Sequence, residues 1–308
     1  MRDVDVSKMK EALSALKREQ AGLSRMKQGT RKRNVRLSEF KRAAEQGMRR
    51  LSESHPGDAF RKGVETRLNA YDVLATHAIP AAPIYTKLDT PFLIWSFHGW
   101  DGGPANFLGD THIEPLNSWA RFRTGYEHGD YIGPPDEVVF YFLWQNETGG
   151  DAVVNVESQL ILDGSCSIFA ESGLIPSPPW GQGTIGESHL YIEANLKLFE
   201  WWNQPATEPL PQPSQTHEVI RLSAGGGFAL WSGTGNGETS WLSGSYHVDY
   251  DAFLVPADAV AVFEVSLRMR YVGRNAWEAV DFQSYDFESL ICPYLELEVL
   301  NAPMMVSG

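Results

Sequence analysis

The chain of 308 residues is 43% hydrophobic and 12% aromatic, a composition typical of a folded protein with one large domain plus an appendage, or with two domains. It contains no run of about 18 apolar residues, so we expect no membrane-spanning helix. The charged N-terminus lacks the apolar core of a signal peptide. We therefore expect a cytoplasmic protein, with signal-free release or export as the alternative.

Charge is distributed unevenly along the chain. Residues 1–75 contain 18 Lys and Arg against 10 Asp and Glu, a net charge of +8; since the whole chain has −13, the remaining residues have −21. Such an asymmetry bears on partners rather than on fold. We expect one end of the molecule to attract the opposite end of a neighbouring copy, or else a glycan or another polyanion.

Residues 5–75 have the pattern of helices. Apolar side chains recur at spacings of three and four in a first segment, as in a heptad seam, and two further helical segments follow a basic connector. Because this apolar stripe is too narrow to form a core alone, we expect a hairpin or coiled-coil-like element that drives homo-oligomerisation. The predicted assembly interface comprises Met9, Leu13, Leu16, Leu23, Arg31, Lys32 and Arg33.

A proline-rich boundary follows the helical pattern. Ile79–Pro83 contains two prolines separated by small residues, which end a helix and form a short, stiff linker. The predicted organisation is a helical assembly segment over residues 1–78, a linker over 79–90 and a β domain over 91–308.

The stretch Glu137–Ser172 predicts a three-stranded meander. Val138–Gln145 is apolar on both faces, as expected for a strand in a buried sheet. A turn cluster at residues 147–151 precedes Ala152–Leu162, which alternates between apolar and polar residues. Asp163-Gly164 then predicts a two-residue hairpin turn into the third strand.

Later strands are separated by predicted loops at Pro205–Pro213 and Ser232–Ser240. His189–Phe199 and Tyr294–Leu300 alternate, and Val260–Val272 is the clearest strand in the chain. Its odd-numbered residues from Phe263 to Tyr271 should face inward, and Glu264, Ser266, Arg268 and Arg270 should face out. About eight to ten strands without intervening helices predict a mainly β fold, an antiparallel β-sandwich or jelly roll.

The best candidate for a metal site is the motif Asp110-Thr-His112-Ile-Glu114. On a strand these three side chains would share one face and could converge on one ion. With a distant histidine such as His189, the motif also has the ligand order of a facial-triad iron site. However, flanking Gly and Pro residues place it in a predicted loop, so we favour loop residues without a metal and expect no cofactor.

Several tryptophans adjoin loops rich in glycine or polar residues. Exposed there, they would stack on sugar rings, as in a sandwich lectin, although large aromatic residues are more often core or interface anchors. The candidate ligand-binding residues are Trp100, Trp180, Trp231 and Trp241.

The basic patch Arg31-Lys32-Arg33 introduces a further alternative. A jelly roll with a basic N-terminal arm is the build of many small viral capsid proteins, and such an arm binds nucleic acid. Those arms are usually nearly free of acidic residues, whereas residues 1–75 contain 10. Nucleic acid is therefore the less favoured partner.

The favoured interpretation is a non-enzymatic, self-assembling structural or binding subunit. The absence of a Gly-x-Ser-x-Gly motif and of metal-type cysteine spacing disfavours an enzyme. The alternatives are a metal-dependent jelly-roll enzyme with a site around His112, a carbohydrate-binding sandwich, and a capsid-like shell protein with a basic N-terminal arm.

Overall fold

The computed structural model describes residues 84–97, 113–114, 118–133, 135–150, 152–174, 185–201, 210–226, 228–229, 235–285 and 288–299. All regular structure in these ranges is β, which confirms the mainly β prediction. None of them contains a helix long and apolar enough to cross a membrane. The predicted helical segment over residues 1–78, with its seven interface residues from Met9 to Arg33, lies outside the described residues and stays a prediction.

Most of the described strands join one antiparallel sheet. It has thirteen strands, and the short strands β8 (Gly173–Leu174) and β11 (Phe228–Ala229) form a separate parallel pair. The strands of the large sheet are β1 (Ile84–Leu88), β2 (Leu93–Phe97), β3 (Ile113–Glu114), β4 (Trp119–Ala120), β5 (Arg123–Ile132), β6 (Asp136–Gln145), β7 (Ala152–Glu171), β9 (Glu187–Trp201), β10 (Leu210–Gly225), β12 (Gly235–Val255), β13 (Val260–Asp281), β14 (Ser289–Ile291) and β15 (Leu295–Val299).

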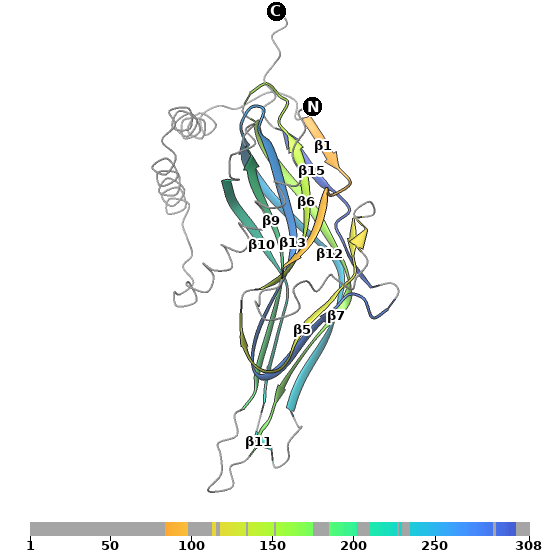
Figure 1. The fold of residues 1–308 in the computed structure, drawn as a ribbon, viewed down its shortest axis with the longest axis vertical. Coiled ribbons are helices and arrows are strands. Elements are labelled where there is room, and N and C mark those ends of the chain that lie inside the picture. The colour runs from red at the N-terminus through yellow and green to blue at the C-terminus, as the bar shows by residue number, and fades with distance from the viewer. Residues whose placement is uncertain are drawn as a thin grey trace, which may run out of the picture. The chain divides into compact units, whose positions relative to one another are not determined.

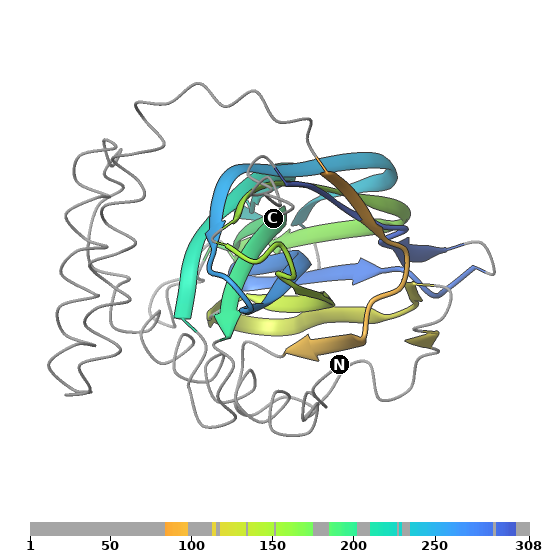
Figure 2. The ribbon, with the colours of Figure 1, turned by 90° about the horizontal axis from the view of Figure 1, so that it is seen from above.

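The large sheet curls so that two halves face each other (Figure 1, Figure 2). In the half that we call the β13 half, β13 lies between β6 and β9, with β2 and β10 at the edges. In the β7 half, β7 lies between β12 and β15, and β1 pairs with β15. The C-terminal part of β13 pairs with β7 and joins the halves. The surface of each half that points away from the core is its outer face.

Side chains from both halves fill one core. Alternate residues of β9, from Leu190 to Leu198, are buried, as are the odd-numbered residues of β13 from Phe263 to Tyr271. Leu297 and its alternate neighbours on β15 face the same core. The predicted inward faces of these three strands are therefore confirmed, because period-two alternation reflects a strand with one face in the core.

The set of alternate residues of β13 that faces the core changes from odd-numbered to even-numbered near Asn275. This residue has a φ of 45°, and the pairing of β13 with β5 shifts between Gly273 and Ala276. A bulge of this kind adds one residue to the strand, so every following side chain points to the opposite face. Beyond it the even-numbered residues are buried, including Glu278 at 1% exposure.

Glu278 is thus a carboxylic acid placed in the core by a backbone irregularity. Its Oε1 atom accepts hydrogen bonds from Ser188 Oγ at 2.8 Å and from the backbone N–H of His189 at 3.0 Å. Burial raises the pKa of Glu278 to about 7, although these hydrogen bonds oppose the shift.

The predicted three-stranded meander is wrong. Although β6 and β7 are consecutive, they do not pair with each other: β6 pairs with β2 and β13, whereas β7 pairs with β12, β14, β15 and the C-terminal part of β13. Asp163-Gly164 forms no hairpin turn, since β7 continues through it to Glu171. The glycine permits a close approach instead, because a Cβ at Gly164 would lie 2.5 Å from the backbone oxygen of Asp281.

Other predicted loops contain strand residues. β10 begins inside the predicted Pro205–Pro213 loop, which its edge position allows because proline cannot donate to a neighbouring strand. β12 begins at Gly235, inside the predicted Ser232–Ser240 loop. The range 79–90, expected as a linker, includes β1, which pairs with β15.

Candidate functional sites on the two outer faces

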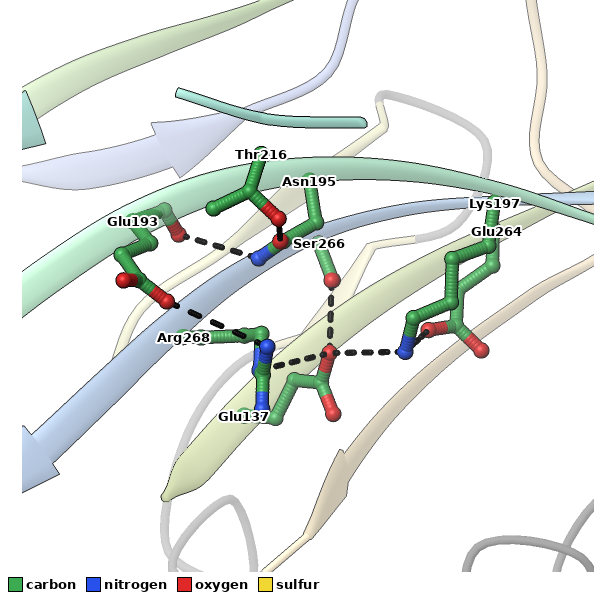
Figure 3. A network of polar contacts seen from close by, with 8 residues as sticks. All are labelled: Glu137, Glu193, Asn195, Lys197, Thr216, Glu264, Ser266 and Arg268. Carbon is green, nitrogen blue, oxygen red and sulfur yellow. Dashed lines mark hydrogen bonds and ion pairs between the residues drawn. The ribbon is translucent and has the colours of Figure 1, made fainter. Parts of the chain in front are cut away.

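The outer face of the β13 half carries a network of ion pairs (Figure 3). Strand register places Glu264 on β13 opposite Lys197 on β9. It places Arg268 between Glu193 on β9 and Glu137 on β6. Opposite charges at facing positions of adjacent strands stabilise a sheet, and each carboxylate here has a cation beside it.

The contacts are close and extend across three strands. Lys197 Nζ lies 3.1 Å from Glu264 Oε1 and 4.0 Å from Glu137 Oε1. Arg268 lies 3.9 Å from a carboxylate oxygen of Glu137 and 3.9 Å from one of Glu193. The two cations therefore share Glu137, which makes the pairs one connected network.

Much of this network is buried. The Glu264 side chain is fully buried, and the side chains of Glu137 and Lys197 are 8% and 15% exposed. Burial alone would lower the pKa of Lys197, but the charges of Glu264 and Glu137 outweigh it, and the pKa is raised. Glu264 and Ser266 point away from the core, as the alternation predicted, yet the expectation that they face solvent is wrong.

Further along this face, His189 links a serine and a carboxylate. Its Nε2 lies 2.9 Å from Glu187 Oε1, and its Nδ1 lies 2.9 Å from Ser223 Oγ. A hydrolase triad has the same three residue types, but there the serine contacts Nε2 and the acid Nδ1. Ser223 and Glu187 are exposed on the sheet surface. This arrangement therefore does not have the hydrogen-bond order of a triad, and both ring nitrogens of His189 already have a partner.

The outer face of the β7 half is acidic. Register places Asp249 on β12 opposite Glu157 on β7, and Glu157 opposite Glu296 on β15. Like charges at facing positions repel and destabilise a sheet. With Asp251 and Glu298 these residues form what we call the acidic face, which lines a hollow of about 370 Å³.

Two histidines lie beside the acidic face. His247 Nδ1 is 3.5 Å from Glu157 Oε1, and His217 Nε2 is 3.7 Å from Asp249 Oδ1. Their side chains are 38% and 59% exposed for His217 and His247, respectively.

Lys87 is the nearest permanent cation by register, because it lies opposite Glu296 across β1 and β15. It pairs instead with Asp89, 3.5 Å away. No Lys or Arg of the described ranges forms an ion pair with the acidic face. Its carboxylates therefore lack the compensation found on the β13 half.

One of the four predicted sugar-stacking residues is described. Trp241 lies on β12 with 61% exposure, and its ring centroid is 6.4 Å from that of Tyr285, which is 54% exposed. Trp100, Trp180 and Trp231 lie outside the described residues.

The predicted metal site is described only at one end. Glu114 lies on β3, whose backbone pairs with that of β4, while Asp110 and His112 lie outside the described residues. In the part of the chain that the structure describes, no group of three or more His, Cys, Asp or Glu side chains is arranged to hold a metal ion.

The acidic face was not predicted from the sequence. Two of its pairs, Asp249 with Asp251 and Glu296 with Glu298, have the i, i+2 spacing that puts carboxylates on one face of a strand. That signal was visible in the sequence. The register that aligns β12, β7 and β15 was not, because it joins segments more than 40 residues apart in the chain.

Comparison with known proteins identifies no relative of this chain in sequence and only weak alignments in structure. No known protein family matches the chain, and no curated protein matches its sequence. It aligns with a structure of infectious bursal disease virus, Gx strain, at 9% identity and a TM-score of 0.10, covering 59% of this chain and 38% of that one. It aligns with a mutant VP2 protein of the same virus, from derived T=1 particles, at 12% identity and a TM-score of 0.09, covering 75% and 50%. The chain thus spans half or less of those chains, and TM-scores near 0.1 establish no common fold.

Proposed function

We propose that this protein is a non-enzymatic, self-assembling structural subunit. In the assembly, the acidic face of one copy binds the basic N-terminal segment, residues 1–75, of another. The observation that carries this proposal is the row of Asp249, Glu157 and Glu296, three carboxylates at facing positions with no Lys or Arg of the described ranges paired to them.

The complementary charge is present in the same chain. The N-terminal segment has a net charge of +8, and the rest of the chain −21. Attraction between them would steer the encounter over about 8–10 Å at physiological salt. The predicted apolar seam of Met9, Leu13, Leu16 and Leu23 would then supply a contact that salt does not weaken.

The proposed subunit has two parts. Its body is the jelly-roll-like sandwich expected from the sequence, and its assembly element is the predicted helical hairpin. A closed, capsid-like shell is one form that such an assembly would take. Particle mass in solution, together with electron micrographs, distinguishes a shell from a small oligomer.

The proposal is tested by neutralising the acidic face in the full chain. We expect the triple variant Glu157→Gln, Asp249→Asn and Glu296→Gln to assemble more slowly than the wild type in sedimentation velocity at low salt. Raising the ionic strength should slow the wild type to the rate of the variant, because both changes remove the same attraction. Reversing Arg31, Lys32 and Arg33 to Glu should slow association in the same way.

A matched control separates this effect from a general loss of charge. Glu147→Gln, Glu238→Gln and Asp258→Asn remove three exposed carboxylates that lie outside the acidic face. This control should assemble like the wild type. Equal assembly rates for the two triple variants would exclude the acidic face as the binding surface. Leu13→Asp should prevent assembly at any salt concentration, because it places a charge in the apolar seam.

Carbohydrate binding is a second candidate, supported by one observation. The exposed, neighbouring rings of Trp241 and Tyr285 offer a surface on which a sugar ring would stack. Neutral oligosaccharides such as maltohexaose and cellohexaose should then quench tryptophan fluorescence in the wild type but not in Trp241→Ala. Identical quenching in both proteins, or none in either, would count against this function.

A further inference from the structure

The cations of the chain beyond residue 75 are few and unevenly paired. There are eight Lys and Arg residues in this region, and all of them lie in the described ranges. Five contact a carboxylate or a backbone carbonyl: Lys87, Arg121, Arg123, Lys197 and Arg268. The other three, Arg221, Arg270 and Arg274, are exposed and form no ion pair with any described carboxylate.

These three arginines gather at one end of the outer face of the β13 half. Register places Tyr191 on β9 between Arg221 on β10 and Arg270 on β13. The guanidinium carbon of Arg270 lies 4.3 Å from the centre of the Tyr191 ring, and that of Arg221 lies 5.0 Å from it. Cation–π attraction therefore holds two guanidinium groups at one aromatic ring, despite their mutual repulsion.

Arg274 lies on β13 four residue pairs further along the strands than Arg270, a separation of about 13 Å between the two backbone positions. It lies opposite Glu187, but the carboxylate of Glu187 is bonded to His189 at 2.9 Å. The carboxylate that lies opposite Arg274 is thus already hydrogen-bonded to a histidine, and it forms no ion pair with Arg274. Three permanent cations consequently lie along one stretch of this outer face, two of them at the Tyr191 ring, in a region whose net charge is −21.

We propose that Arg221, Arg270 and Arg274 form a binding site for a phosphate or sulfate group carried by a small ligand. The guanidinium group is planar and presents donors that match an oxyanion in pairs. Arginines without carboxylate partners keep those donors available. Because the surrounding region repels anions at long range, recognition of one oxyanion requires a local cluster of this kind. The site is separate from the acidic face and does not depend on the assembly proposed above.

The proposal is tested by calorimetric titration of the full chain with glucose 6-phosphate, glucose 6-sulfate and glucose at constant ionic strength. Binding of both esters but not of glucose identifies an oxyanion site, and the ratio of the two affinities tells which ester it prefers. We expect Arg221→Gln, Arg270→Gln and Arg274→Gln each to weaken ester binding by about tenfold, since each removes charge-assisted hydrogen bonds.

Three further variants distinguish a site from general charge. Arg123→Gln removes the same charge from an arginine that is paired with Asp281 at 3.7 Å, and it should bind the esters like the wild type. Arg270→Lys keeps the charge but loses the planar fork, so it should bind more weakly than the wild type and more tightly than Arg270→Gln. Tyr191→Leu should also weaken binding, because the two guanidinium groups lose the ring that positions them.

Two results would overturn the proposal. One is equal weakening by Arg123→Gln and Arg270→Gln, which would mean that only net charge matters. The other is an absence of ester binding in the wild type. In that case the particle mass of Arg270→Gln is compared with that of the wild type. If the mass does change, the arginine cluster is a contact between copies of the chain and not a ligand site.

Discussion

Both outer faces place charged side chains at facing positions of adjacent strands, but the facing charges are opposite on the β13 half and alike on the β7 half. On the β13 half, register sets Lys197 opposite Glu264, and Arg268 between two glutamates. On the β7 half, register sets Glu157 between Asp249 and Glu296. The first face pairs its carboxylates with cations of the chain, whereas the carboxylates of the second are paired with no Lys or Arg of the described ranges. Strand register thus determines whether charged residues on an outer face attract or repel one another across the strands.

The largest effect is expected where the buried network loses its cation. Lys197→Met should lower the free energy of unfolding by about 3–5 kcal/mol, because it leaves Glu264 and Glu137 buried without the charge between them. Urea denaturation measures the change. Replacing both Lys197 and Glu264 with apolar residues should recover part of the loss. A loss of less than about 1 kcal/mol in the single variant would show that the network contributes little.

The next effect concerns Glu278, which belongs to neither face. Its pKa is about 7 in the folded protein against an ordinary value of 4.5, so the folded state binds the proton more tightly. Its contribution to stability is therefore full below pH 4.5 and is lost as the pH rises to about 7, a change of roughly 3 kcal/mol. The difference in unfolding free energy between the wild type and Glu278→Gln should fall through this window. A constant difference from pH 4 to 8 would mean that Glu278 keeps an ordinary pKa.

A smaller effect is expected at the connections between the halves. Asn146 is fully buried and donates hydrogen bonds from Nδ2 to the carbonyls of Gly150, Val255 and Pro256. It thus ties the β6–β7 connection to the β12–β13 connection. Asn146→Ala should lower the free energy of unfolding by about 2 kcal/mol, because buried carbonyls lose their donor. Thr148→Val, which removes one hydroxyl bonded to Asn146 Oδ1, serves as the milder comparison.

The smallest effect has the opposite sign. Neutralising the centre of the acidic row with Glu157→Gln should raise the stability of the chain by about 0.5 kcal/mol at low salt, because it relieves repulsion from both neighbouring strands. The gain should vanish at about 1 M salt, where such repulsion is screened. Thermal unfolding at the two salt concentrations measures it, with Glu147→Gln as a control at an exposed turn. Destabilisation by Glu157→Gln would mean that its contact with His247 outweighs the repulsion.

Alternation in the sequence predicted the strands that border the core. β9, β13 and β15 each have one face in the core, so their apolar residues recur at every second position. The prediction of a hairpin turn at Asp163-Gly164 failed, because a glycine in a strand pattern has two physical explanations. Gly164 is as suitable for a turn as for a close approach of backbone, and only the position of Asp281 shows which applies.

The charged faces were harder to predict, because their chemistry depends on register. The spacing of Glu264, Ser266 and Arg268 showed that these residues share a face, but not that part of that face is buried. Whether a carboxylate meets a cation or another carboxylate depends on strands that are distant in sequence. The arginine cluster around Tyr191 is of the same kind, since its members come from three strands.

The position of β13 in the sheet has a consequence for synthesis of the chain. This strand pairs with β5, β6, β7 and β9, all of which precede it in the chain, and it ends at Asp281. These four strands, several of them largely apolar, therefore emerge from the ribosome before β13 has been synthesised. Until β13 emerges, those strands have unpaired edges and exposed apolar faces, which are the features that promote aggregation of nascent chains. Newly made chains should thus depend on chaperones until β13 has emerged, and a chain truncated before residue 260 should be recovered as aggregate.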